Sequence, residues 1–499
     1  MKLNKLFGII GSVHVPSSLI AAQAGTDGGS PAEKRLEWLR SQLIGRDLQF
    51  DTCFGKRLLT YADHTASGRC LRYIEEYITQ QVLPFYGNSH TSDSSCGEKT
   101  TRMVHEAREY IRRCVGACPE DALIFCGSGA TAAIKRLQEV MGIAVPANLR
   151  SQVIENLREE ERWVVFVGPF EHHSNLLSWR QSIAEVVEIG IDADGLVDME
   201  ALELQLASMK YSNRPKLGSF SACSNVTGII ADTRALSRLL HKYGAYACFD
   251  FATSGPYVEI DMRSREEEGY DAIFLSPHKF PGGPGPSLPS TCGGGVVAYV
   301  NGFNAKDTVY YNDIEEREDA GTPPIIQEIR AALAFWVKET VGYEPIDLHE
   351  TIYMKMAMER GGHFVFGPYG HRSLEWRRAS PFTFTRHRRL QRPKTGVDKS
   401  RLRYYLTKEE FAFILDAIEF IDHHTRKKNH GADGMDSPKI VWNGKNLRFE
   451  TEDKEAFLEY RLIYPDAAIS SAAASADKGK WALGLIHKPG RKKIGGYKQ

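Results

Sequence analysis

The sequence predicts an α/β protein with a large domain built on a mostly parallel sheet and a smaller α+β domain toward the C-terminus. Short apolar runs alternate with amphipathic segments that are long enough to serve as crossover helices, which is typical of a parallel sheet. The 499 residues, 42% of them hydrophobic, can form at least two domains with sizeable cores.

The elements follow from these patterns in chain order. Residues 1–30 are predicted to be a flexible extension, and residues 31–45 have the leucine and tryptophan spacing of a helix. A long amphipathic helix is predicted over 324–340, and a strand over Arg403–Leu406 with a helix after it. The predicted strands of the large domain are Leu123–Cys126, Trp163–Val167, Val186–Ile189, Leu217–Ala222, Ala245–Asp250 and Ala272–Leu275. We therefore predict a large domain over 31–330, a small domain over 331–430 and a polar C-terminal extension over 431–499 that includes an alanine- and serine-rich linker.

Charge and cysteine content restrict the class of protein. Lysine plus arginine equals aspartate plus glutamate at 63 each, so no global charge favours nucleic acid or an anionic membrane. The nine cysteines are irregularly spaced, which favours reduced thiols over a disulfide framework. No apolar run is long enough to span a membrane. We expect a cytoplasmic protein; the apolar stretch Leu6–Ala22 after two lysines leaves an organellar or secretory address open.

The strongest local signal for chemistry is the segment Asp271-Ala-Ile-Phe-Leu-Ser-Pro-His-Lys279. An apolar strand ends there in Ser276, His278 and Lys279, and glycines follow. A lysine at a strand end beside an imidazole suits a Schiff-base nucleophile. The motif alone also fits an exposed lysine on a turn.

Two other strand ends carry groups that suit a pyridine cofactor with a phosphate. Asp250 ends an apolar strand, where its carboxylate could pair with a protonated ring nitrogen or could cap a helix. The small-residue turn Gly127-Ser-Gly-Ala-Thr131 leads into a helix, and free amides at a helix N-terminus bind anions. Such turns are also common without a ligand.

Two polar motifs follow the predicted strands. In Glu171-His-His-Ser-Asn175, an imidazole at a strand end could stack on an aromatic cofactor. Adjacent histidines lack the spacing of a helical zinc pair, so no metal site is predicted. In Ser224-Asn-Val-Thr-Gly228, the amide of Asn225 could bond a ring oxygen, or the segment could be an ordinary turn.

Taken in order, these blocks and Gly321-Thr-Pro-Pro324 resemble the aminotransferase class V family, which includes cysteine desulfurases and selenocysteine lyases. The resemblance extends over about residues 45–425 and includes Tyr61-Ala-Asp-His-Thr-Ala-Ser67. It implies the fold of fold-type I pyridoxal-phosphate (PLP) transferases and an amino-acid substrate. The resemblance covers most of the chain, and several ordered blocks are far more specific than any one of them.

The resemblance implies a role for each matching residue. Lys279 matches the lysine that carries the cofactor, His172 the stacked imidazole, and Asp250 the partner of the ring nitrogen. Asn225 and Thr253 lie at the positions near the ring oxygen, although desulfurases usually have glutamine at the second. The phosphate-binding positions are Ala130, Thr131, Ser276 and His278, and Thr322 matches a threonine that reaches the neighbouring subunit's phosphate, which implies a homodimer.

The C-terminal part departs from the family pattern. Desulfurases carry a sulfur-accepting cysteine in the small domain, but no cysteine follows Cys292, and Phe366 stands where relatives often have it. The segments 286–295 and 358–367 suggest a divergent enzyme or missing internal pieces. Arg401 is the candidate for the substrate carboxylate, because a guanidinium matches a carboxylate, or it is a solvated arginine.

A second hypothesis keeps the fold without catalysis. Basic residues interleaved with aromatic ones lie between His371 and Lys394, a pattern that can bind single-stranded nucleic acid. A solvated basic loop explains them better, because no recognised nucleic-acid module surrounds them. The alternative function is therefore an inactive scaffold or a nucleic-acid-associated protein.

Overall fold

The computed structural model describes residues 30–52, 55–89, 93–263, 266–284, 297–300, 308–310, 313–315, 323–361, 404–416, 439–442, 446–451 and 481–487. Contacts divide the chain into two units, one of Met1–Ile44 with Ala62–Leu406 and the other of Gly45–Tyr61 with Thr407–Gln499. This division differs from the boundary predicted after residue 330, which stays a prediction.

The first unit contains the predicted parallel sheet. Its five strands lie in the order β4-β3-β5-β6-β7, and every neighbouring pair is parallel. Strands β3 and β5 are buried along their whole length, as expected for a sheet covered on both faces. The bounds are β3 Val164–Val167, β4 Glu185–Glu188, β5 Lys216–Ser221, β6 Ala245–Asp250 and β7 Ala272–Phe274.

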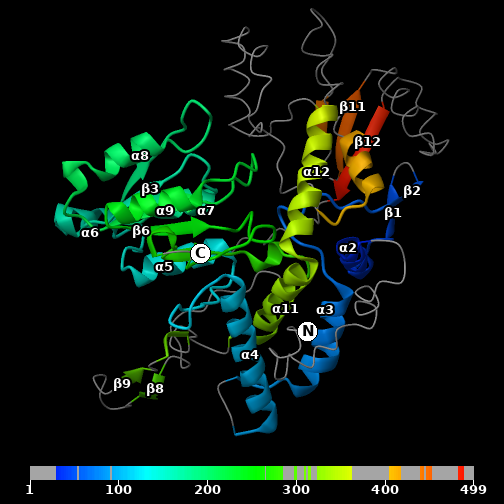
Figure 1. Ribbon diagram of the computed structural model, residues 1–499, viewed down its shortest axis with the longest axis horizontal. Coiled ribbons are helices and arrows are strands. Elements are labelled where there is room, and N and C mark those ends of the chain that lie inside the picture. Colours follow the sequence, from blue (N-terminus) through cyan, green and yellow to red (C-terminus); the bar gives the residue numbers. More distant parts are fainter. Residues whose placement is uncertain are drawn as a thin grey trace, which may run out of the picture. The chain divides into compact units, whose positions relative to one another are not determined.

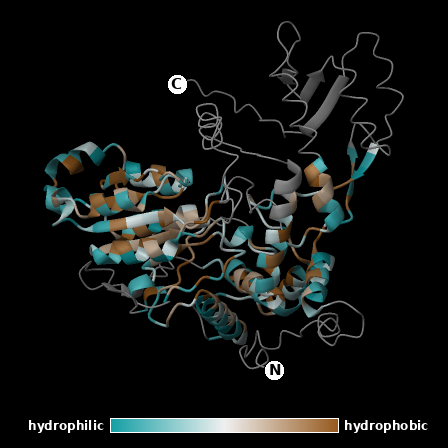
Figure 2. Ribbon diagram, turned by 45° about the horizontal axis from the view of Figure 1, so that its top comes forward, coloured by the Kyte–Doolittle hydropathy of each residue, from teal (hydrophilic) through white to brown (hydrophobic). Residues whose placement is uncertain are grey.

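Alternate residues of β3 pack into two separate cores, one on each face of the sheet. Val165 and Val167 join a cluster with Ile134 of α5 and Trp179 of α7, while Phe166 joins the larger cluster. Helices therefore lie on both sides of the strands, and several show hydrophobic and hydrophilic sides (Figures 1 and 2). The helices of this region are α5 Ala130–Val140, α6 Arg150–Asn156, α7 His173–Gln181, α8 Met199–Leu206 and α9 Thr233–Lys242, with single turns η5 Glu159–Glu161, η6 Met209–Tyr211, η7 Glu266–Glu268 and η8 Pro277–Lys279.

A second group of helices packs around α11, which is buried along most of its length. Trp336 of α11 meets Trp38 of α2 edge-on, with ring centroids 6.2 Å apart. The helices predicted over 31–45 and 324–340 are thus present as α2 and α11. The group comprises α2 Pro31–Gln42, α3 Arg72–Tyr77, α4 Ser95–Cys114, α11 Ile325–Val341 and α12 Tyr343–Gly361, with short turns η3 Ile78–Val82 and η4 Leu83–Phe85.

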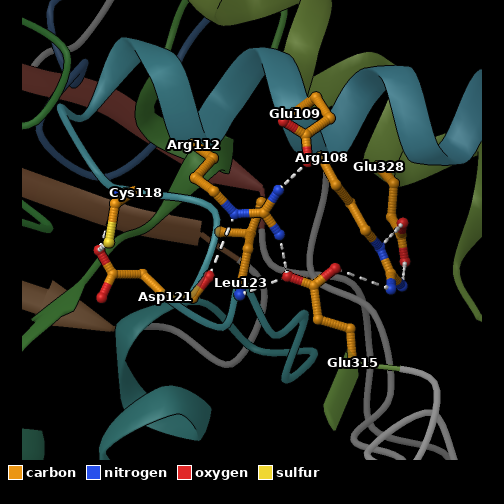
Figure 3. A network of polar contacts seen from close by, with 8 residues as sticks. All are labelled: Arg108, Glu109, Arg112, Cys118, Asp121, Leu123, Glu315 and Glu328. Atoms are coloured by element: carbon orange, nitrogen blue, oxygen red, sulfur yellow. Dashed lines mark hydrogen bonds and ion pairs between the residues drawn. The ribbon is translucent and has the colours of Figure 1, made fainter. Parts of the chain in front are cut away.

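Buried ion pairs join α4 to α11 and to the segment before α5 (Figure 3). Arg108 of α4 donates two hydrogen bonds to Glu328 of α11, at 2.9 and 3.0 Å. Arg112, one turn further along α4, pairs with Glu315. Glu315 also accepts from the backbone N–H of Leu123 at 2.7 Å. The segment that leads into α5 is therefore held by a side chain from a distant part of the chain.

That contact explains one wrong prediction. Leu123–Cys126 is not a strand, because the N–H of Leu123 bonds to the Glu315 carboxylate and none of the described strands pairs with this apolar run. The predicted strand Arg403–Leu406 is also wrong where the structure describes it, since Tyr404–Leu406 form a turn. The helix predicted after it is present over 408–416.

The remaining strands are antiparallel. In the first unit, β8 Val297–Val300 pairs with β9 Thr308–Tyr310. In the second unit, β1 Gln49–Thr52 pairs with β2 Gly55–Leu58, and β10 Lys439–Trp442, β11 Asn446–Thr451 and β12 Trp481–His487 form a sheet in that order. Among the described helices, none combines the length and apolar character needed to cross a bilayer.

Candidate active site

A cavity of about 260 Å³ lies where the carboxyl ends of the parallel strands meet the start of α5. Parallel strands bring their carboxyl ends to one edge, which is the usual ligand site of an open α/β sheet. The structure brings to this cavity every predicted site residue that it describes. These are Ala130, Thr131, His172, Asn225, Asp250, Thr253, Ser276, His278 and Lys279.

One end of the cavity is formed by the turn before α5. Gly129 has φ 61° and ψ −152°, a conformation that is essentially restricted to glycine. A Cβ there would lie 2.8 Å from Ser276 Oγ and 3.1 Å from His278 Cε1. Ser276 Oγ accepts from the Ala130 N–H at 3.1 Å, so the η8 turn and the start of α5 are joined. Thr131 Oγ1 lies 2.7 Å from Ser174 Oγ. This end gathers hydroxyls, an imidazole and the N-terminus of a helix.

Asp250 lies at the end of β6 and is only 5% exposed. Its Oδ1 accepts from the Ala252 N–H at 2.8 Å, and residues 252–257 form turns rather than a helix. The carboxylate therefore does not cap a helix. Burial raises the pKa of Asp250, while the Ala252 N–H and the charge of Lys279 lower it. A buried carboxylate that lines the cavity is thus influenced by the lysine ammonium.

Lys279 is the last residue of the single turn η8. Gly68, far toward the N-terminus in the sequence, donates its backbone N–H to the carbonyl oxygen of His278 in this turn at 2.8 Å. Burial, and then the charge of Lys279, lower the pKa of both His172 and His278; the neighbouring His173 further lowers that of His172. The amine of Lys279 is therefore close enough to two imidazoles and Asp250 to affect the protonation of each.

His172 caps the N-terminus of α7. Its Nδ1 accepts from the Ser174 N–H at 3.1 Å and lies 2.8 Å from Ser174 Oγ. An accepting Nδ1 leaves the proton of the neutral ring on Nε2. The capping contact fixes the imidazole at the start of the helix, where it lines the cavity.

Sequence reasoning missed several residues of the cavity wall. Ser128 and Ser174 stood inside motifs that were singled out for other residues. Ser221 is the last residue of β5 and the next-to-last residue of the strand predicted over Leu217–Ala222, so a position near a strand end was an available signal. Cys223 and Ala252 carried no separate signal. The wall residues beyond the predicted ones are Ala66, Ser128, Ser174, Ser221, Cys223 and Ala252.

Two predicted site residues, Thr322 and Arg401, lie outside the described residues, as do Phe366 and the basic stretch from His371 to Lys394. Within the part of the chain that the structure describes, no three histidine, cysteine or acidic side chains are grouped so as to hold a metal ion.

Comparison with known proteins finds cysteine desulfurases both among similar sequences and among similar structures. A probable cysteine desulfurase of Halalkalibacterium halodurans is 26% identical over 330 residues, which cover 62% of this chain and 75% of the relative. One of Staphylococcus aureus is 27% identical, with 63% and 74% covered. The apo structure of a cysteine desulfurase from Thermococcus onnurineus shares the fold, with a TM-score of 0.56 and 19% identity over 77% of this chain and 97% of that one.

A model of the aminotransferase class-V family matches residues 60–362, which is more than half of the chain and includes every residue of the cavity. The chain therefore belongs to the aminotransferase class-V family of pyridoxal-phosphate-dependent enzymes.

Proposed function

We propose that the protein binds PLP through the amine of Lys279 and transforms an amino acid at its α-carbon. The observation that carries this proposal is the cavity at the carboxyl ends of β5 and β6, where a lysine, a buried aspartate and two imidazoles meet. A scaffold without chemistry has no need for a buried carboxylate and a lysine on the same cavity wall.

The residues fit the cofactor at both ends. A phosphate needs hydrogen-bond donors and close backbone approach; Gly129 supplies the approach, and Thr131, Ser276 and the N-terminus of α5 supply donors. A pyridine nitrogen needs a carboxylate that is shielded from water, which Asp250 provides. His172 offers a flat ring that is already fixed by its contacts with Ser174.

Each side chain then has a defined task. When bound, PLP supplies a sink for the negative charge that develops at the substrate α-carbon. Asp250 Oδ holds a proton at the ring nitrogen, Lys279 Nζ takes the proton from the α-carbon, and His172 covers one face of the ring. Asn225 and Thr253 are proposed to bond the ring oxygen.

The substrate proposed for the first test is cysteine, because the relatives named above are probable cysteine desulfurases. We do not propose sulfur transfer through a thiol of the small domain, since no cysteine follows Cys292. A homodimer, with Thr322 at the neighbouring subunit's phosphate, and Arg401 at the substrate carboxylate stay predictions.

The test is covalent mapping of the cofactor. The full chain is incubated with PLP, reduced with borohydride and digested, and the pyridoxyl group is located by mass spectrometry. We expect it on Lys279, with a visible absorption band that Lys279→Ala abolishes. Lys338 is the internal control, because burial lowers the pKa of its amine to about 7, but this amine does not line the cavity and is bonded to the Gly255 carbonyl oxygen.

The outcomes separate the two hypotheses. A label on Lys279 leads to a screen of amino acids, beginning with cysteine and selenocysteine, with a thiol reductant present because alanine formation with release of sulfide or selenide consumes two electrons. The α-keto or alanine product and the released sulfide or selenide are measured. A folded protein that takes up no PLP, or takes it up on Lys338, contradicts the proposal. Salt-sensitive RNA binding by such a protein would instead support the scaffold hypothesis.

A further inference from the structure

One partly buried carboxylate beside the cavity has no task in the chemistry above. Glu171 precedes His172 in the loop between β3 and α7, and both of its carboxylate oxygens are engaged. Oε1 accepts from the backbone N–H groups of Gly168, at 3.2 Å, and Ser221, at 2.9 Å. Oε2 accepts from Ser221 Oγ at 2.7 Å and Asn175 Nδ2 at 2.5 Å.

These four donors belong to three different parts of the fold. Gly168 directly follows β3, Ser221 ends β5, and Asn175 lies in the first turn of α7. A Cβ at Gly168 would lie 2.9 Å from Glu171 Oε1, so the loop accepts the carboxylate at this distance only with a glycine there. The side chain therefore connects the loop, the neighbouring strand and the helix at one point.

The contacts continue into the core. Asn175 Oδ1 accepts from Trp179 Nε1 at 2.9 Å and from Ser219 Oγ at 2.6 Å, and both Asn175 and Trp179 are fully buried. Since Oδ1 is committed to these two donors, the amide nitrogen of Asn175 must face Glu171. The orientation of the whole chain of contacts is thus set by packing.

We propose that Glu171 is a positioning residue whose carboxylate ties the loop that carries His172 to strand β5 and so holds the imidazole at the cavity wall. The position of the imidazole does not depend on the cofactor. That the imidazole covers one face of the PLP ring rests on the function proposed above.

The charge state fits this role. All four donors favour the ionised carboxylate. Only one of them, the Ser221 hydroxyl, could instead accept a hydrogen bond from the protonated carboxyl group. Burial acts against them and raises the pKa of Glu171 to about 7, and the charge of Asp250 on β6 acts in the same direction. The charge of Lys279 lowers the pKa of Asp250 and that of His172.

The test replaces Glu171 by Gln. A glutamine keeps one oxygen for the two backbone N–H groups, but its amide nitrogen then faces the amide nitrogen of Asn175. The double variant Glu171→Gln with Asn175→Asp restores a donor opposite an acceptor between these two side chains, at the loss of the hydrogen bond that Asn175 Nδ2 donates to the Ser219 carbonyl oxygen at 3.2 Å. Glu188→Gln is the matched control, because Glu188 ends the neighbouring strand β4 and its carboxylate contacts α7 only at the exposed Arg180.

The readout is the rate at which diethylpyrocarbonate modifies His172 in the full-length protein without PLP, measured by mass spectrometry against pH. His173 in the same peptide is the internal reference. We expect Glu171→Gln to raise the His172 rate at least threefold and to shift its titration upward, toward that of a free histidine. The control should match wild type, and the double variant should return most of the way to it.

The same variants are then loaded with PLP, and the expected second effect is a shifted absorption band in Glu171→Gln alone. An unchanged His172 rate in folded Glu171→Gln overturns the proposal. If this variant does not fold, the double variant decides: wild-type kinetics support the proposal, whereas an unfolded or faster-reacting double variant overturns it. Wild-type protein that takes up no PLP refutes the proposed function but leaves the His172 rates to decide this inference.

Discussion

Replacing Gly129 by Ala tests whether the turn before α5 is shaped for a phosphate. The backbone at this glycine has φ 61° and ψ −152°, and a non-glycine residue there costs about 1–3 kcal/mol. The added Cβ would also lie 2.8 Å from Ser276 Oγ and within 3.1 Å of the His278 ring, so these side chains or the turn must move.

The cost should appear in one of two measurable quantities. If the turn keeps its conformation, the free energy of unfolding falls by about 1–3 kcal/mol. If the turn relaxes instead, Ser276 and His278 are displaced from the end of the cavity. The same free energy then appears as PLP affinity that is weaker by about 5- to 150-fold, at 1.4 kcal/mol for each factor of ten.

Gly142→Ala is the matched control at the other end of α5. Gly142 also has a positive φ, 69°, but a Cβ there would meet nothing within 4 Å. This variant should lose about 1 kcal/mol of stability and bind PLP like wild type. Urea denaturation of the protein without cofactor and a PLP titration measure both quantities. If Gly129→Ala loses no more than Gly142→Ala in stability and affinity together, the steric reasoning is wrong.

Three further predictions follow from buried charges. Glu328→Gln should lower the free energy of unfolding by about 3 kcal/mol, because it removes the carboxylate that accepts two hydrogen bonds from the buried Arg108. Glu139→Gln, in an exposed pair on α5, should cost less than about 0.5 kcal/mol in the same urea experiment; similar losses would contradict the role of burial. Burial lowers the pKa of Lys338 to about 7, so above pH 7 the unfolded chain binds more protons than the folded chain. The free energy of unfolding of wild type, relative to that of Lys338→Met, should therefore rise from pH 7 toward 10. A difference that does not change with pH refutes this. Because burial raises the pKa of Asp250, Asp250→Asn should keep or increase the free energy of unfolding at pH 8. The same variant should lower PLP-dependent turnover by about 10²–10³-fold. A large loss of stability would show that the carboxylate is structural.

The sequence was most informative where one strand end carried one chemical group. The strand predicted over Ala245–Asp250 has the same bounds in the structure. Because parallel strands end at a common edge, Asp250, His172 and Lys279 could be expected to meet before any contact was known. Their convergence on one cavity is a consequence of topology rather than of local sequence.

The apolar run Leu123–Cys126 shows where such reasoning fails. Hydrophobic periodicity over four residues does not distinguish a strand from an extended segment that pairs with side chains. The N–H of Leu123 is bonded by Glu315, 192 residues further along the chain. No pattern around Leu123 could reveal that partner, because it depends on how α4 and α11 pack.

The case of Glu171 is more instructive, because the motif that contains it was recognised and only its histidine was interpreted. A glutamate beside two histidines reads as a solvated polar loop, since acidic side chains are seldom fully buried without partners. Its partial burial becomes favourable only after β3 and β5 pair in parallel, which brings Ser221 to the carboxylate from 50 positions away. Residues that touch a ligand can thus be predicted from strand ends and chemistry, whereas residues that hold them in place require the tertiary contacts. If Glu171 positions His172 as proposed, the residues of the cavity wall can be predicted from the sequence, whereas the residues that support the wall cannot.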